Sequence, residues 1–362
     1  MAATVASSAV PVGGPVLPFP FAQGGDPAAF DSAPLMPPPR GVSSNFEGPF
    51  SLAPTAKAVT FVTATLMVAT VCLRFWARVL VTRDLGVDDA LLLAGVVTTV
   101  AYCTLSVLSN GYLGLHSWNV HFKSYSVSSL KTITITVPTL YTVSIILIKS
   151  SLFTLYLRIF QPSRKITLMT WAGLAFTVLG HSALLVLNFV LCRPSQWSGD
   201  DDEPPVVLYI ANNARCEQTK MDLTIADGVI GALTDTYLMV VPISAISGLN
   251  MSHGHKKGAI AVSRTVLCDA TLCSLASLHF HIIERTSADY SWHEGFMTLL
   301  RVVELNAGII SASIPVAWIV IKTIIRNCCL RKMSWKRSNS AEGTAPTIST
   351  FTTINRKSVL EE

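Results

Sequence analysis

The sequence predicts an all-α membrane protein, a polytopic bundle of seven transmembrane helices with the amino terminus outside the cell and the carboxyl terminus in the cytosol. Three observations predict this fold. Of the 362 residues, 50% are hydrophobic and only 14% are charged, and the mean hydropathy of +0.49 is too high for a soluble chain of this length. Seven apolar stretches approach the length of about 20 residues that a helix needs to cross a bilayer. Lysine and arginine are concentrated on alternate connections.

The apolar stretches define the expected spans. They are Leu52–Leu73, Asp88–Ser109, Ile133–Leu157, Ile166–Leu191, Met221–Ser247, Gly258–Ile283 and Phe296–Ile325. The sixth stretch carries Arg264 and Asp269, two charges that are costly in a bilayer. Without it the bundle would have six spans.

The orientation follows from the basic residues, which are retained on the cytosolic side of a membrane. Those on the predicted inner connections are Arg74, Arg78, Arg83, Arg158, Arg164, Lys165, Lys256 and Lys257. At and after the end of the last span lie Lys322, Arg326, Arg331, Lys332, Lys336 and Arg337. The predicted outer side instead contains the acidic run "GDDDEPP" at 199–205. The predicted location is the plasma membrane.

Both ends of the chain differ in composition from the membrane domain, 52–325. Residues 1–51 are rich in proline and alanine, which predicts a disordered extracellular tail. Residues 326–362 are first basic and then rich in serine and threonine, which predicts a cytosolic tail with candidate phosphorylation sites.

Two cysteine pairs suggest covalent modification. Cys192 and Cys216 flank the second outer loop, where an oxidising environment would favour a disulfide; two free thiols are the alternative. Cys328 and Cys329 follow the last span among basic residues, where palmitoylation would add a membrane anchor; unmodified cysteines are the alternative.

Lys149 interrupts the apolar third span and needs an explanation. It lies nine positions before Arg158, so at 1.5 Å per residue it is about 13 Å above the inner boundary. A lone ammonium at that depth costs roughly 3 kcal/mol, and we therefore expect it to pair with an acid inside the bundle. Asp235 matches it best in depth, and Asp269 is the second choice. The pair either specifies helix packing or takes part in ligand binding or switching.

Other charged residues are expected in two further positions. Asp227, Arg301 and Glu304 should form a separate polar layer nearer the outer face. Asp88 and Asp89 begin the second span, where acids cap free backbone N–H groups. Their available cationic partners are Arg74, Arg78 and Arg158.

Several motifs in this order resemble those of the fungal rhodopsin-domain family. They are "LGVDDALLLAG" at 85–95, "GYLGLHSW" at 111–118, "IKSSLFTLYLRIF" at 148–160, "CRPSQW" at 192–197, "LTDTYLMVVPI" at 233–243 and "DYSWHEGFMTLLRVVELNAGIISASIP" at 289–315. The resemblance covers about Leu52–Ile325 and implies a seven-helix integral membrane protein. The segment after "HKKG" departs from the family pattern, because Arg264, Asp269, His279 and His281 replace apolar residues.

The sequence predicts neither a cofactor nor a metal site. Between Arg301 and Lys322 the last span has no lysine that could bind retinal. The histidines expected on the outer side are His116, His121, His279, His281 and His293, and their spacing matches no standard ligand pattern. Nothing resembles a nucleotide-binding loop, and a nucleic-acid partner is not expected.

Two classes of function remain, and the family that the sequence resembles includes receptor-like proteins and members encoded in secondary-metabolite gene clusters. The favoured class is a receptor-like protein that binds a hydrophobic or extracellular ligand in the bundle and signals to a cytosolic partner. The alternative is a membrane-embedded enzyme or accessory protein of secondary metabolism, in which Glu304 or Asp227 would be the general acid. An enzyme is the less favoured of the two.

Overall fold

The protein is described from a computed structural model. The structure describes residues 34–109, 114–121, 135–159, 163–191, 214–247, 271–283, 287 and 289–340, and it describes no side chains at 109, 214–218, 246–247, 290 and 317–340. Within these ranges the regular secondary structure is helical, and one isolated bridge between Pro34 and His121 is the only extended pairing.

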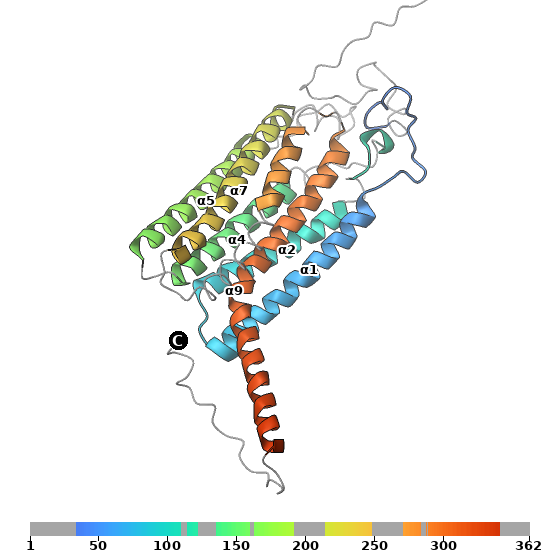
Figure 1. Cartoon of the computed structure of the whole chain (residues 1–362). Helices are drawn as coiled ribbons and strands as arrows, with labels where there is room; N and C mark the ends of the chain where they lie inside the picture. The colour runs from blue at the N-terminus through green and yellow to red at the C-terminus, as the bar shows by residue number, and fades with distance from the viewer. Residues whose placement is uncertain are drawn as a thin grey trace, which may run out of the picture.

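The first half of the described chain forms three long helices (Figure 1). Helix α1, Ala53–Trp76, has a proline in its first turn, where no backbone hydrogen bond is lost, and continues into the π-helical turn η3, Ala77–Thr82. Helix α2 is Val87–Ser109, and the 3-10 turn η4 is Ser117–Asn119. Helix α4 is Val137–Ile159.

The second half adds the remaining helices of the bundle. They are α5, Arg164–Leu191; α7, Ala214–Ser247; a shorter apolar helix, Thr271–Ile283; and α9, Tyr290–Ser340. Pro242 lies inside α7 and Pro315 inside α9, and each removes one backbone donor from its helix.

Six helices of the described chain are long and apolar enough to cross a membrane. The predicted sixth span, 258–283, falls partly outside the described residues, and its described part is the helix Thr271–Ile283. The all-helical fold is therefore confirmed, whereas the count of seven spans and the orientation of the termini remain predictions. The largest change from the expected boundaries is in α9, which ends at Ser340 rather than Ile325 and begins at Tyr290 rather than Phe296.

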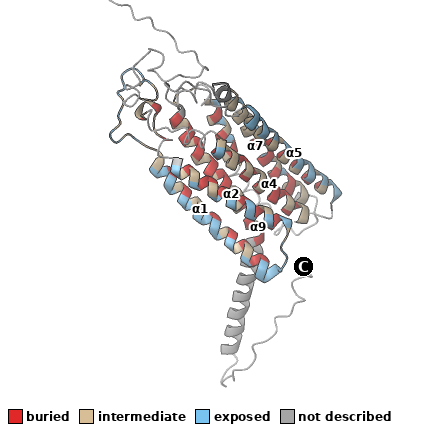
Figure 2. Cartoon of the chain, turned by 180° about the vertical axis from the view of Figure 1, so that it is seen from behind, coloured by how far each residue is buried: buried red, intermediate tan, exposed pale blue. Residues whose placement is uncertain are grey.

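Helix α4 occupies the centre of the bundle and contacts α2, α5, α7 and α9. Of the apolar window of α4, 61% is buried, compared with 11% for α5 at the periphery. Figure 2 shows the same distinction, with exposed residues along α1 and α5. Large apolar side chains such as Phe61 on α1 and Leu168 on α5 are exposed, as expected for surfaces that contact lipid.

Glycines allow the helices next to α4 to approach closely, which is typical of helix packing in membranes. Ile148 of α4 lies between Gly95 of α2 and Gly308 of α9; a Cβ added at these glycines would be 3.2 Å and 3.0 Å from its side chain. On the other side, a Cβ at Gly173 of α5 would be 2.5 Å from the Tyr237 ring. These contacts place the polar residues of α4 within reach of α7 and α9.

Part of the predicted outer tail has tertiary contacts. The backbone N–H of Leu35 donates to the carbonyl of Val120 over 2.9 Å, and that of Leu52 donates to Gly114 over 2.9 Å. Gly114, which adopts a positive φ of 85°, in turn donates to the carbonyl of Ser291 over 3.0 Å. Residues 34–52 therefore lie against the η4 loop and the start of α9.

The Gly173 contact leads to a test of the bundle packing. We expect Gly173→Ala to lower the thermal stability of the detergent-solubilised protein by about 1–3 kcal/mol, because the new methyl group would overlap the rings of Phe153 and Tyr237. Gly231→Ala is the matched control, since among the described residues a Cβ there meets nothing within 4 Å. Equal melting temperatures for the two variants would contradict this packing.

Candidate functional site

The lysine of α4 forms the predicted ion pair at the centre of the bundle. Lys149 is 3% exposed, and its Nζ lies 2.9 Å from Oδ1 of Asp235 on α7. The same ammonium donates to Oγ1 of Thr234 over 2.7 Å and to the carbonyl of Gly231 over 3.1 Å. An ammonium has three donors, so each of its protons has an acceptor.

Glu304 belongs to this same network and not to a separate outer layer, so the predicted layering was wrong for this residue. The Ser274 hydroxyl contacts Oδ2 of Asp235 and lies 3.0 Å from Oε1 of Glu304. Because α9 begins at Tyr290, Glu304 lies fourteen residues into the helix, about 21 Å along its axis. The expected start at Phe296 had placed it about 9 Å shallower.

The network lines a small cavity. Its walls include Ile148, Lys149, Asp235, Glu304 and Ser311, and its volume of about 20 Å³ is enough for one water molecule. The cavity contains two carboxyl groups and one ammonium group in an otherwise apolar interior. Electrostatic interactions are strong in such a low-dielectric environment.

A larger polar cleft adjoins the network between α4, α5, α7 and α9, with a volume of about 70 Å³. Arg301 and Glu294 line it and form an ion pair of 2.9 Å, and Asp227 lines it while bonding to Nδ1 of His181 over 2.7 Å. Tyr141 lines the same cleft and donates to Oε2 of Glu304 over 2.8 Å. Asp227 and Arg301 are therefore in one polar region, as predicted.

Sequence reasoning missed five residues of the site: Tyr141, His181, Thr234, Ser274 and Glu294. A helical period of polar residues was available as a signal. Ser274, Ser277 and His281 recur at intervals of three and four and are all buried, as expected for the inward face of a membrane helix. Glu294 and Arg301 are likewise two turns apart on α9.

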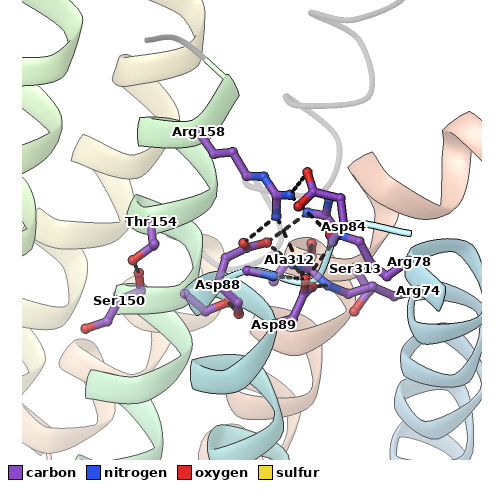
Figure 3. Close-up of polar contacts among 12 residues, drawn as sticks. Arg74, Arg78, Asp84, Asp88, Asp89, Ser150, Thr154, Arg158, Ala312 and Ser313 are labelled. Carbon is purple, nitrogen blue, oxygen red and sulfur yellow. Dashed lines mark hydrogen bonds and ion pairs between the residues drawn. The ribbon is translucent and has the colours of Figure 1, made fainter. Parts of the chain in front are cut away.

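A second ionic cluster lies at the far end of the bundle, where α2 begins (Figure 3). Arg74 is fully buried and contacts Asp88 at 2.5 Å, Asp89 at 2.7 Å and the carbonyl of Ala312 on α9. Arg78 lies 2.9 Å from Asp88. The three cationic partners expected for the two aspartates are thus all present, since Arg158 of α4 also lies 3.0 Å from Asp88.

The aspartates do less capping than expected. Oδ2 of Asp89 accepts the N–H of Gly86 over 3.1 Å, which is a capping contact at the start of α2. The Asp88 carboxylate instead binds Arg74, Arg78 and Arg158. The cluster therefore links α1, α2, α4 and α9, and Arg158 also pairs with Asp84.

Some predicted sites cannot be located. Asp269 and Cys192 lie outside the described residues, as do the side chains of Cys216, Cys328 and Cys329. Within the described ranges, no group of three or more His, Cys, Asp or Glu side chains is arranged to hold a metal ion. His116 stacks between Trp118 and Trp292 and bonds to Asp289 over 2.6 Å.

The central ion pair can be tested by breaking and exchanging it. We expect Lys149→Ala or Asp235→Ala to destabilise the solubilised protein by about 3–5 kcal/mol, because each leaves a buried charge without its partner. The exchanged variant Lys149→Asp/Asp235→Lys should regain most of this loss. Lys57→Ala, at an exposed position of α1, is the control for removing a lysine. An exchanged pair no more stable than the single variants would contradict a pairwise interaction.

In the arginine cluster, we expect the loss of stability to be larger for removal of Arg74 than for removal of Arg158. Removing the fully buried Arg74 leaves Asp88 and Asp89 short of donors, so Arg74→Ala should cost about 3–5 kcal/mol of stability. The side chain of Arg158 is 26% exposed, and its loss should cost roughly 1 kcal/mol because solvent screens the pair. Thermal melts in detergent of both variants measure the difference, and the reverse order would contradict the assignment.

The ionic clusters and the cleft lie in the part of the chain that matches a known family. No curated protein and no solved structure matches it. The model of the fungal rhodopsin domain matches residues 73–323, a range that contains both ionic clusters and the polar cleft. With most of its membrane helices inside this match, the chain belongs to the fungal rhodopsin domain family.

Proposed function

We propose that this protein is a receptor-like membrane protein that binds a small ligand in the polar cleft and transmits the event through α4 and α9. The observation that carries the proposal is the position of Tyr141. Its side chain lines the cleft and also donates to Glu304 in the central network. A ligand that engages Tyr141 would therefore act directly on a buried ionic network.

The lining of the cleft supports an amphipathic ligand. Leu184, Leu185, Leu223 and Pro138 offer apolar contact area, and Tyr141, Asp227, Glu294 and Arg301 offer hydrogen-bonding groups. Small-molecule sites combine apolar contact area with polar groups that fix the orientation of the ligand. The Lys/Arg distribution predicts that this end of the bundle faces away from the cytosol.

Two continuous helices lead from the cleft to the arginine cluster. Helix α4 carries Tyr141, Lys149 and Arg158, and α9 carries Arg301, Glu304 and Ala312. A ligand that favours one arrangement of these helices would change the contacts of Arg74 and Arg158 at the predicted cytosolic face. A cytosolic signalling partner would recognise that change.

A membrane enzyme is the second candidate, and one observation favours it. Glu304 is buried beside the central cavity, and its hydrogen-bond partners among the described residues are two hydroxyl groups. A carboxyl group held this way could act as a general acid toward a hydrophobic substrate. Asp227 suits that role less well, because it is bonded to His181.

The receptor-like function predicts that Tyr141→Phe disables the protein without unfolding it. In a fungal strain lacking the gene, the variant should assemble normally but fail to restore the transcript profile that the wild-type gene restores. Tyr102→Phe is the matched control, since the buried Tyr102 hydroxyl has no hydrogen-bond partner among the described residues. The two rings lie only 6.0 Å apart.

The same strains separate the two candidate functions. Full restoration by Tyr141→Phe would contradict a role for the cleft hydroxyl in signalling. Loss of a single metabolite in the Glu304→Gln strain, with an otherwise normal transcript profile, would favour the enzyme.

A further inference from the structure

Two carboxyl groups share one hydroxyl group in the centre of the bundle. Ser274 Oγ contacts Oδ2 of Asp235 and lies 3.0 Å from Oε1 of Glu304. The other oxygen of Glu304, Oε2, lies 2.8 Å from the Tyr141 hydroxyl. Four side chains thus form an unbroken chain of oxygen contacts.

The contacts in this chain require more protons than its hydroxyl groups supply. Each of the three oxygen–oxygen contacts needs one proton between its atoms. Ser274 and Tyr141 contribute one hydroxyl proton each. With both carboxyl groups ionised, one contact would place lone pairs against each other in a buried site. One of the two carboxyl groups must therefore hold the third proton.

The surroundings assign that proton to Glu304. Asp235 faces the Lys149 ammonium at 2.9 Å, and an adjacent cation favours an ionised carboxylate. All three protons of the Lys149 ammonium have acceptors, because it also donates to Thr234 and to the Gly231 carbonyl. Thr234 donates its own proton to the same carbonyl over 2.9 Å and so can only accept from Lys149. Ser274 then donates to Asp235 and accepts from Glu304.

We infer that Glu304 is a proton-binding site inside the bundle and that Tyr141 connects it to the polar cleft. Among the described residues, Tyr141 is the cleft-lining side chain that bonds to Glu304. On release, the Glu304 O–H turns toward Tyr141 and the Tyr141 hydroxyl turns toward the cleft. The Glu304 O–H bond breaks as the Tyr141 oxygen accepts its proton, Tyr141 gives its own proton to a cleft water that leaves as hydronium, and Glu304 remains as a carboxylate. No electron is transferred.

Proton release would change how the helices are held. With Glu304 ionised, Ser274 can donate to only one of its two acid neighbours, so the helix Thr271–Ile283 loses its bond to either α7 or α9. The ionisable and charged groups near Glu304 are Tyr141 and Lys149 on α4, Asp235 on α7 and Arg301 on α9, and α2 brings Tyr102 toward Tyr141. The helix Thr271–Ile283 adds His281 to the cleft wall, and α5 places His181 against Asp227.

Infrared spectroscopy of the full chain in lipid nanodiscs tests this inference. Near neutral pH, the wild-type protein should show the carbonyl stretch of a protonated carboxylic acid, which shifts in heavy water. Subtracting the Glu304→Gln spectrum from the wild-type spectrum should leave a positive band at the position of this acid carbonyl stretch. A difference in the carboxylate bands, or a wild-type spectrum without an acid band, would overturn the inference, and the second result needs no variant.

Thermal stability gives a second readout of the same assignment. A glutamine can reproduce both bonds of a protonated glutamate, since its carbonyl accepts from Tyr141 and its amide donates to Ser274. Glu304→Gln should therefore melt at the wild-type temperature, whereas Glu304→Ala should melt lower. A glutamine variant as unstable as the alanine variant would count against a protonated Glu304.

The connection to the cleft is tested by the rate of hydrogen–deuterium exchange of the acid band. Tyr141→Phe should slow the exchange at least about tenfold, because it removes the hydroxyl that relays the proton, and Tyr102→Phe should leave the rate unchanged. An unchanged rate in Tyr141→Phe would overturn the role of Tyr141. The proton site does not depend on the proposed function: an acid band with full complementation by Tyr141→Phe would support the proton site and contradict the receptor-like role.

Discussion

The buried ammonium of Lys149 is the constraint on which the centre of this bundle depends. An unpaired charge at that depth would be too costly to keep, so α7 must present acceptors to α4 at that level. It supplies a carboxylate, a hydroxyl and a backbone carbonyl within 3.1 Å of the ammonium. Gly231 contributes the carbonyl. The relative height of α4 and α7 is therefore fixed by hydrogen bonding as well as by packing.

The ion pair has a further consequence for the neighbouring helices. Once Asp235 is committed to Lys149, the hydroxyl of Ser274 can bridge to the second acid, Glu304, and the network extends to α9. Tyr141 then joins Glu304 to the cleft. A polar chain of this kind is stable only when each donor and acceptor is satisfied. That requirement leads to the proton on Glu304 and makes the network sensitive to any change in the cleft.

The arginine cluster has a similar role at the other end of the bundle. Arg74 bonds to the carbonyl of Ala312 in the turn that Pro315 interrupts, and it also holds both aspartates of α2. Four helices meet there around three arginines and three aspartates. Because α4 and α9 enter both ionic clusters, movement of either helix changes contacts at both ends.

The sequence by itself determined the membrane environment, the helical class and most of the helix positions, because bilayer thickness and hydrophobicity act locally along the chain. It also predicted the partner of Lys149, because depth in a membrane can be counted in residues from a helix end. Counting residues from the expected helix start gave the wrong depth for Glu304, because α9 begins earlier than expected. Its first turn contacts residues far away in the sequence, as in the bond between Ser291 and Gly114.

Only the tertiary structure decided which polar side chains meet. Depth gives the height of a residue but not the direction in which it points around the helix, so depth alone could not assign Tyr141, Ser274 and Glu294 to the site. The helical spacing of Ser274 and Glu294 indicates an inward face but not the residue that each contacts. The bond from Tyr141 to Glu304 joins residues 163 apart in the sequence. That contact depends on how α9 packs beside α4, with Gly308 against Ile148.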